Sequence, residues 1–141
     1  MDIEKIFTQT LDSAFEVHKT LGPGLLESTY QQCLAHELKQ RNLHIETEKP
    51  LPVNYKEIQL ECGYRIDILV ENKIIVELKA VEKLNDLHLA QIMSYMKLSG
   101  TKLGLLLNFN TRYLKNGIKR TKALPQRTRR KARKTTKKSK E

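Results

Sequence analysis

Two apolar runs separated by three polar residues, "RIDILV" (65–70) and "IIVELK" (74–79), predict a β-hairpin at the centre of this chain. Successive side chains on a strand point to opposite faces, so the apolar residues at every second position share one face of each strand. With "ENK" (71–73) as the loop, the two apolar faces meet, which makes the register self-consistent. The predicted cross-strand pairs are Ile66 with Leu78, Ile68 with Val76, and Val70 with Ile74.

The other face of the predicted hairpin carries two carboxylates. The same register sets Asp67 opposite Glu77 and Arg65 opposite Lys79, with facing Cβ atoms roughly 4.5–5.5 Å apart. Two carboxylates this close in a half-buried sheet repel each other, and a divalent cation would relieve the repulsion. Mg²⁺ prefers carboxylate oxygens and water, and Lys79 is placed to orient the attacking water or to stabilise a transition state on phosphate. The alternative is a solvated sheet face on which the two acids pair with Arg65 and Lys79.

Helices and a further strand surround this hairpin. Apolar residues recur every three or four positions over 3–21 and again over about 25–41, which predicts two amphipathic helices separated by the breaker "LGPG". Residues 45–80 predict three strands, the first of which contains prolines and lies at an edge. A third helix is predicted over 85–98, and "LGLLLNF" (103–109) is predicted to be a central strand buried on both faces. The order predicts an α/β domain with a mixed sheet of mainly four strands.

Polar side chains lie on helix faces that the apolar pattern assigns to the interior. Glu27, in the first turn of the second helix, falls inside the apolar arc and is expected to face the core or a cleft. Its alternative role is that of an acid favoured at a helix N-terminus. Gln91 and Tyr95 share a stripe of the third helix with His88, and we expect them to rim the same cleft. Alternatively, Tyr95 is a core aromatic residue and His88 a surface histidine.

Positive charge is concentrated at one end of the chain. Residues 119–141 hold 12 of the 26 Lys and Arg and a single acid, which leaves 14 basic and 15 acidic residues in 1–118. We expect one domain over 1–118 and a disordered tail over 119–141, because such a segment buries too little apolar surface to fold alone. The tail is either an arm that holds phosphate backbones or a solubilising extension. The basic residues that would bind nucleic acid are Arg127, Arg129, Arg130, Lys131, Arg133 and Lys134.

Several other classes of protein do not fit the sequence. The two cysteines, Cys33 and Cys62, lack the paired spacing of a zinc site or a disulfide framework. No apolar run approaches the roughly 20 residues that a membrane-spanning helix needs, and the first residues lack the pattern of a signal peptide. We therefore expect a cytoplasmic protein without membrane partners.

The motifs together resemble a known family. "GLLESTY" (24–30) fits the pattern G-x-x-E-x-x-Y through Gly24, Glu27 and Tyr30, and the similarity continues through "YRIDILVENKIIVELKAVE", "HLAQIMSYMK" and "LGLLLNF". This pattern is similar to that of the GxxExxY proteins, which belong to the PD-(D/E)XK nuclease-like superfamily. The resemblance covers about residues 3–118. One departure is Asn110 in "NFN", where the family usually has glycine, which puts the geometry of that turn in question.

The resemblance implies a restriction-endonuclease-like αββαβ core and a set of site residues. The superfamily's carboxylates and lysine map onto Asp67, Glu77 and Lys79, and Glu27 matches the helix acid that often completes the metal site. Gln91 and Tyr95 match a Q-x-x-x-Y motif of some nuclease branches. The implied cofactor is Mg²⁺ or Mn²⁺, and the implied partner is DNA or RNA.

Three functions remain open from the sequence. The first is a metal-dependent nuclease that hydrolyses phosphodiester bonds and uses these six residues. The second is a non-catalytic nucleic-acid-binding or regulatory module on the same fold, with the tail supplying affinity. The third is a protein-interaction domain on which the acids are only a polar face. Fold alone does not choose among them.

Overall fold

The computed structural model describes residues 1–123, so the six tail residues named above lie outside the described part of the chain. Within it, the three predicted helices are present with ends that differ from the prediction by at most two residues. The helices are α1 (Ile3–Leu21), α2 (Glu27–Gln40), α3 (Asp86–Ser99) and the short 3₁₀ helix η1 (Leu114–Gly117). The strands are β1 (Ile45–Pro50), β2 (Val53–Tyr55), β3 (Ile58–Leu60), β4 (Arg65–Val70), β5 (Ile74–Lys79), β6 (Leu103–Asn108) and β7 (Ile118–Lys122).

A mixed sheet forms the centre of the molecule. Its strand order is β1–β4–β5–β6–β7, in which β5 and β6 are parallel and the other neighbours are antiparallel. Parallel neighbours need a crossover connection, and α3 lies between β5 and β6 in the chain. The predicted α/β class and mixed sheet are confirmed, with five strands in this sheet where mainly four were predicted.

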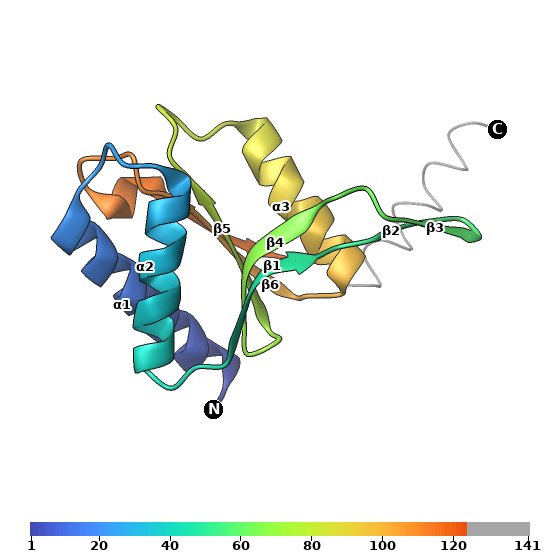
Figure 1. Cartoon of the computed structure of the whole chain (residues 1–141), viewed down its shortest axis with the longest axis horizontal. Coiled ribbons are helices and arrows are strands. Elements are labelled where there is room, and N and C mark those ends of the chain that lie inside the picture. The colour runs from blue at the N-terminus through green and yellow to red at the C-terminus, as the bar shows by residue number, and fades with distance from the viewer. Residues whose placement is uncertain (124–141) are drawn as a thin grey trace.

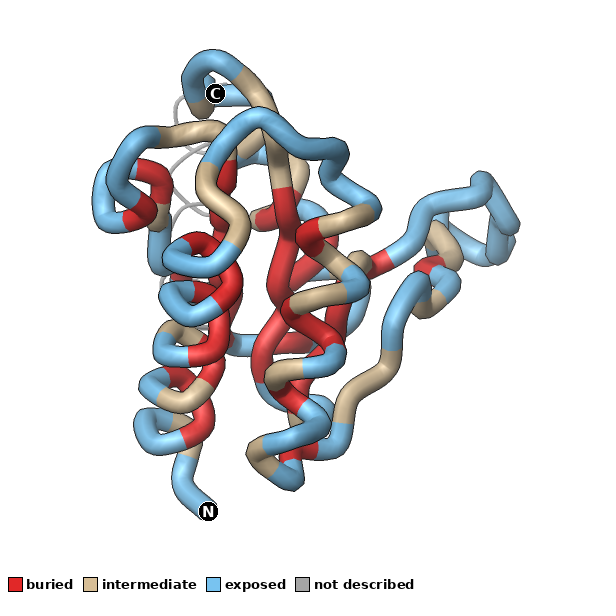
Figure 2. The backbone as a smooth tube through the Cα atoms, turned by 60° about the vertical axis from the view of Figure 1, so that its left-hand side comes forward, coloured by how far each residue is buried: buried red, intermediate tan, exposed pale blue. Residues whose placement is uncertain are grey.

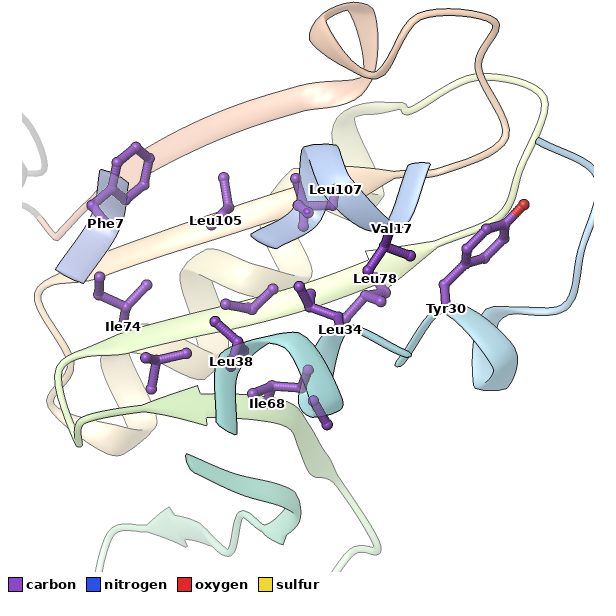
Figure 3. Packing of buried hydrophobic residues seen from close by; sticks show 14 of the residues in the cluster. Phe7, Val17, Tyr30, Leu34, Leu38, Ile68, Ile74, Leu78, Leu105 and Leu107 are labelled. Atoms are coloured by element: carbon purple, nitrogen blue, oxygen red, sulfur yellow. The ribbon is translucent and has the colours of Figure 1, made fainter. Parts of the chain in front are cut away.

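Helices cover both faces of the sheet (Figure 1). α1 and α2 pack on one face, where Tyr30, Leu34 and Leu38 meet Ile68, Leu78 and their neighbours (Figure 3). α3 packs on the opposite face through Ile92, Tyr95 and Met96. The buried residues follow these two interfaces, as the red segments of Figure 2 show. None of the helices formed by residues 1–123 is long and apolar enough to cross a membrane.

The edge strand β7 is not predicted by the apolar pattern. It pairs with β6 from Leu103↔Lys122 to Leu107↔Ile118, so the predicted boundary between domain and tail at residue 118 cuts through a strand. Only Thr121 and, in part, Ile118 point inward, and Thr121 Oγ1 donates to Met96 Sδ at 3.1 Å. Basic side chains on an edge strand discourage pairing with other chains, so they are compatible with this position.

A second, two-stranded sheet leaves the body of the molecule between β1 and β4. The strands β2 and β3 pair with each other only, and the hairpin extends away from the helical layers (Figure 2). Residues 45–80 therefore contain five strands where three were predicted. The base of this hairpin lies where β1 ends and β4 begins, and β4 begins two residues before Asp67.

Candidate active site

The β4–β5 hairpin opens at the two acids. The predicted pairs Val70↔Ile74 and Ile68↔Val76 are confirmed, but the ladder stops there and the predicted pair of Ile66 with Leu78 is wrong. Ile66 instead joins the core on the α3 side of the sheet, while Ile68 lies on the side of α1 and α2. The regular alternation of β4 therefore changes at Asp67.

Two side-chain hydrogen bonds replace the missing part of the ladder. The main-chain N–H of Asp67 donates to Glu77 Oε2 at 2.8 Å, and the main-chain N–H of Leu78 donates to Asp67 Oδ2 at 2.9 Å. Each acid thus accepts a main-chain N–H from the opposing strand. Because a buried N–H group needs a partner, these bonds hold the strands together at the point where ordinary pairing ends.

Both carboxylates sit where ionisation is unfavourable. Only 3% of Glu77 is exposed, and Asp67 is half-buried. Burial, and after it the neighbouring Asp67, raise the pKa of Glu77 from 4.5 to about 8. Burial also raises the pKa of Asp67 from 3.8 to about 6, against the lowering effect of the hydrogen bond from Leu78. Among residues 1–123, neither acid forms a salt bridge with Arg65 or Lys79, so the solvated-face alternative is wrong.

A hydrogen-bonded chain on α3 positions the lysine. Lys79 Nζ donates to Gln91 Oε1 at 2.8 Å, and Gln91 Nε2 donates to the Tyr95 hydroxyl at 3.4 Å. The predicted stripe of Gln91 and Tyr95 therefore does face the same side of the hairpin as Lys79. His88 does not join it: it is half-buried, and its Nδ1 accepts from the main-chain N–H of Asn85 in a capping box.

Glu27 stands at the first residue of α2 and is exposed, so of the two predicted surroundings, core or cleft, the core is wrong. Its charge nevertheless raises the pKa values of both Asp67 and Glu77, which places it on the same side of the domain. The loop before it is held by Tyr30, whose hydroxyl donates to the Gly22 carbonyl at 2.6 Å and accepts from the Leu25 N–H at 3.1 Å.

The conformation of this loop explains why the G-x-x-E-x-x-Y motif has a glycine, Gly24, and a tyrosine, Tyr30, at its two ends. Gly24 has a φ of 100°, a backbone conformation that other residues rarely adopt. The Tyr30 ring stacks on Phe109 at 4.6 Å and 10°, which fixes the tyrosine against the end of β6. The glycine and the tyrosine therefore set where α2 begins, and so where Glu27 stands.

Glu48 is a fourth acid near the pair, and it was not predicted. It lies in β1 between the pairs Thr47↔Ile68 and Lys49↔Ile66, across from Asp67, and has a φ of 52°. Its Oε1 accepts from Gln31 Nε2 of α2 at 2.9 Å, and its charge raises the pKa of Asp67 more than that of Glu27 does. Glu48 could have been identified only from its position opposite Asp67 in the neighbouring strand. Local sequence patterns do not show that β1 is the neighbour of β4 on this side.

Comparison with known families agrees with this geometry. The model of the PD-(D/E)XK nuclease superfamily matches residues 4–121. The chain belongs to this superfamily. Searches of curated proteins and of solved structures found no match. The observed αββαβ order, with two added edge strands and a separate hairpin, is consistent with the restriction-endonuclease-like fold of PD-(D/E)XK proteins.

The turn in which Asn110 departs from the usual glycine does not require one. Asn110 is absent from the residues with positive φ, and its Nδ2 donates to the Val81 carbonyl at 3.4 Å. Asn108 makes the stronger connection between this turn and the segment after β5, because its Oδ1 accepts from the Val81 N–H and its Nδ2 donates to the Val81 carbonyl. The presence of Asn110 in place of glycine is therefore compatible with the superfamily site.

The candidate metal donors are the Asp67 and Glu77 carboxylates. Each uses one oxygen for a main-chain N–H, and the other oxygen, Oδ1 or Oε1, accepts no hydrogen bond from the described residues. No three Asp, Glu, His or Cys side chains within residues 1–123 are close enough together to hold a metal ion, so Glu27 and Glu48 lie outside this donor pair. A pair of carboxylates completed by water suits Mg²⁺, which usually binds through one or two carboxylates.

Proposed function

We propose that the protein is a metal-dependent nuclease of the GxxExxY type that hydrolyses phosphodiester bonds in DNA or RNA. The observation that carries this proposal is the pair formed by buried Glu77 and half-buried Asp67, which accept main-chain N–H groups from each other's strands next to a lysine oriented from α3. A pair that only stabilised the fold would not need carboxylates with raised pKa values, because burying charge costs free energy. Residues with strongly perturbed pKa values gather at functional sites.

Asp67 and Glu77 would hold Mg²⁺ or Mn²⁺, and their raised pKa values are the physical reason. A cation offsets the repulsion between the two carboxylates and favours their ionised forms. When bound, such an ion makes water a better nucleophile and neutralises charge that develops on phosphate. Glu27 and Glu48 add negative charge around this pair without joining it.

Lys79 would act on the attacking water or on the scissile phosphate. Its ammonium has three N–H donors, of which one is used by Gln91 Oε1, so two remain for other acceptors. Gln91 cannot turn freely, because its Nε2 bonds to the Tyr95 hydroxyl. In this assignment Gln91 and Tyr95 are positioning residues for the lysine, and they need not touch the nucleic acid.

The test is a cleavage assay on single-stranded, duplex and structured DNA and RNA in Mg²⁺ or Mn²⁺. Wild type should cut at least one substrate, and Asp67→Asn and Lys79→Met should each lower the rate by roughly 100-fold or more, as expected for loss of a charged group that acts in the transition state. Lys102→Met is the matched control for the lysine, because Lys102 is exposed and lies before β6. It should cut like wild type.

A wild type that cuts none of these substrates would refute the nuclease assignment, as would variants that cut as fast as wild type. Binding without cleavage, weakened by removal of residues 124–141, would instead favour the non-catalytic module. Gln91→Leu separates positioning from direct contact: if Gln91 acts through Lys79, it should lower the rate in wild type and have little further effect in Lys79→Met.

A further inference from the structure

One aromatic side chain next to this site is largely uncovered. Tyr64 immediately precedes β4, three residues before Asp67, and 47% of it is exposed. Its ring makes an edge contact with Tyr95, with centroids 6.1 Å apart and planes at 61°. The main chain at this point is fixed, because the Leu51 N–H donates to the Tyr64 carbonyl at 2.8 Å.

The contact with Tyr95 connects Tyr64 to the lysine of the site. The Tyr95 hydroxyl accepts from Gln91, whose other amide atom accepts from Lys79. Burial raises the pKa of the Tyr95 hydroxyl, and the charges of Glu77 and Asp67 contribute to the increase. The Tyr64 ring therefore contacts a residue, Tyr95, whose hydroxyl is influenced by the charges of both acids.

Other exposed tyrosines differ from Tyr64 in their surroundings. Cationic groups lie over the Tyr113 ring, with Arg112 at 5.3 Å, and over the Tyr55 ring, with Lys56 at 5.4 Å. Among residues 1–123, no cationic side chain lies over the Tyr64 ring. Its uncovered surface is thus free to contact a flat, uncharged group.

The charge balance of the domain explains why such a contact would be needed. Residues 1–123 hold 17 basic and 15 acidic residues, and four acids lie in or beside the site. This surface attracts a polyanionic backbone weakly, so much of the affinity at the site must come from a contact that is not electrostatic. Stacking of bases on aromatic side chains supplies affinity of this kind in proteins that bind single strands.

We propose that Tyr64 is the residue on which an unpaired base of the substrate stacks beside the scissile phosphate. The proposal rests on the proposed nuclease function and narrows its substrate class to single strands or to strands with an unpaired base at the site. In a duplex each base is stacked between its neighbours, so no base face is left free for the Tyr64 ring to contact. The residue then determines substrate choice and takes no part in the chemistry.

The test measures stacking without cleavage. The full chain is titrated, in EDTA, against a single-stranded oligonucleotide that contains the fluorescent base 2-aminopurine, and against the same strand in a duplex. Wild type should quench the fluorescence of the single strand more than that of the duplex. Tyr64→Leu should reduce the quenching and weaken single-strand binding by about 5- to 150-fold, the range measured for loss of one stacked base.

Matched variants separate stacking from other effects. Tyr64→Phe and Tyr64→Trp keep an aromatic face, so Tyr64→Trp should bind the single strand at least as tightly as wild type and Tyr64→Phe within about 3-fold of it. Tyr113→Leu removes another exposed tyrosine, whose ring is covered by Arg112 and Lys115, and should bind like wild type. If Tyr64→Leu binds and quenches like wild type, or if Tyr64→Trp binds as weakly as Tyr64→Leu, the stacking role is refuted.

The two proposals fail in different ways. A wild type that cuts nothing but shows quenching that depends on residue 64 would refute the nuclease and retain the stacking role. A wild type that cuts while Tyr64→Leu binds and cuts equally well would refute the stacking role alone. A wild type that neither binds nor cuts any strand would refute both.

Discussion

With no cation present, the free energy of unfolding of wild type should fall between mildly acidic and neutral pH. Replacing Glu77 by glutamine should remove most of this fall. The pKa of Glu77 is 4.5 in an open chain and about 8 in the fold, where burial and then Asp67 raise it. Because the folded pKa is the higher one, its contribution to stability is complete below about pH 4.5 and is lost as the pH rises towards 8.

The magnitude follows from the width of that window. Between about pH 5.5 and pH 7.5 the unfolded chain has released this proton and the folded chain still holds it, so each pH unit costs about 1.4 kcal/mol. Over this interval the free energy of unfolding of wild type should therefore fall by about 2 to 3 kcal/mol more than that of Glu77→Gln. Glutamine has nearly the same shape and keeps an oxygen that can accept the Asp67 N–H.

Urea denaturation in EDTA, followed by circular dichroism at both pH values, measures this difference. Glu61→Gln, which changes an exposed acid at the base of the β2–β3 hairpin, should follow wild type. Adding Mg²⁺ at the higher pH should stabilise wild type more than Glu77→Gln, because the ion binds the ionised pair. Parallel changes in wild type and Glu77→Gln would refute the reasoning, since Glu77 would then not hold a proton in the fold.

Two further predictions concern the framework around the site. Gly117→Ala should lower the free energy of unfolding by about 1–3 kcal/mol in urea denaturation, because an added Cβ would lie 2.3 Å from the main-chain oxygen of Asn108. Gly104→Ala, whose added Cβ meets only side chains, should cost less, and the reverse order would contradict the argument. Tyr30→Phe should cost about 1 kcal/mol through the lost bond to the Gly22 carbonyl, and an unchanged stability would show that this bond does not hold the loop before α2.

The central hairpin shows how far local patterns reach. The alternation of apolar residues predicted the pairs Ile68↔Val76 and Val70↔Ile74, because a shift by one residue would turn the apolar face towards solvent. The same pattern predicted Ile66 opposite Leu78, and this was wrong. Hydrophobic alternation contains no information about side chains that accept main-chain N–H groups, which is what ends the ladder at Asp67.

The site residues likewise divide into those that local spacing predicts and those that depend on contacts between distant segments. Spacing on one helix brought Gln91 and Tyr95 to the face that meets Lys79, since residues four apart lie on one side of a helix. Helical position alone could not decide whether Glu27 faces the core or a cleft, and the core is wrong because α2 starts at this residue, which is exposed. Glu48 was missed, because its nearness to Asp67 depends on β1 pairing with β4.

By itself, the sequence determined the three helices, the core strands and the meeting of Asp67 with Glu77, because each of these follows from periodicity within a short segment. The tertiary structure decided the rest. It made a strand of residues 118–122, whose polar composition is acceptable only at the edge beside β6. It also set the burial that raises the pKa values of the two acids and placed Tyr64 against Tyr95. Burial and contacts between distant segments exist only once the layers have packed, so no local pattern contains them.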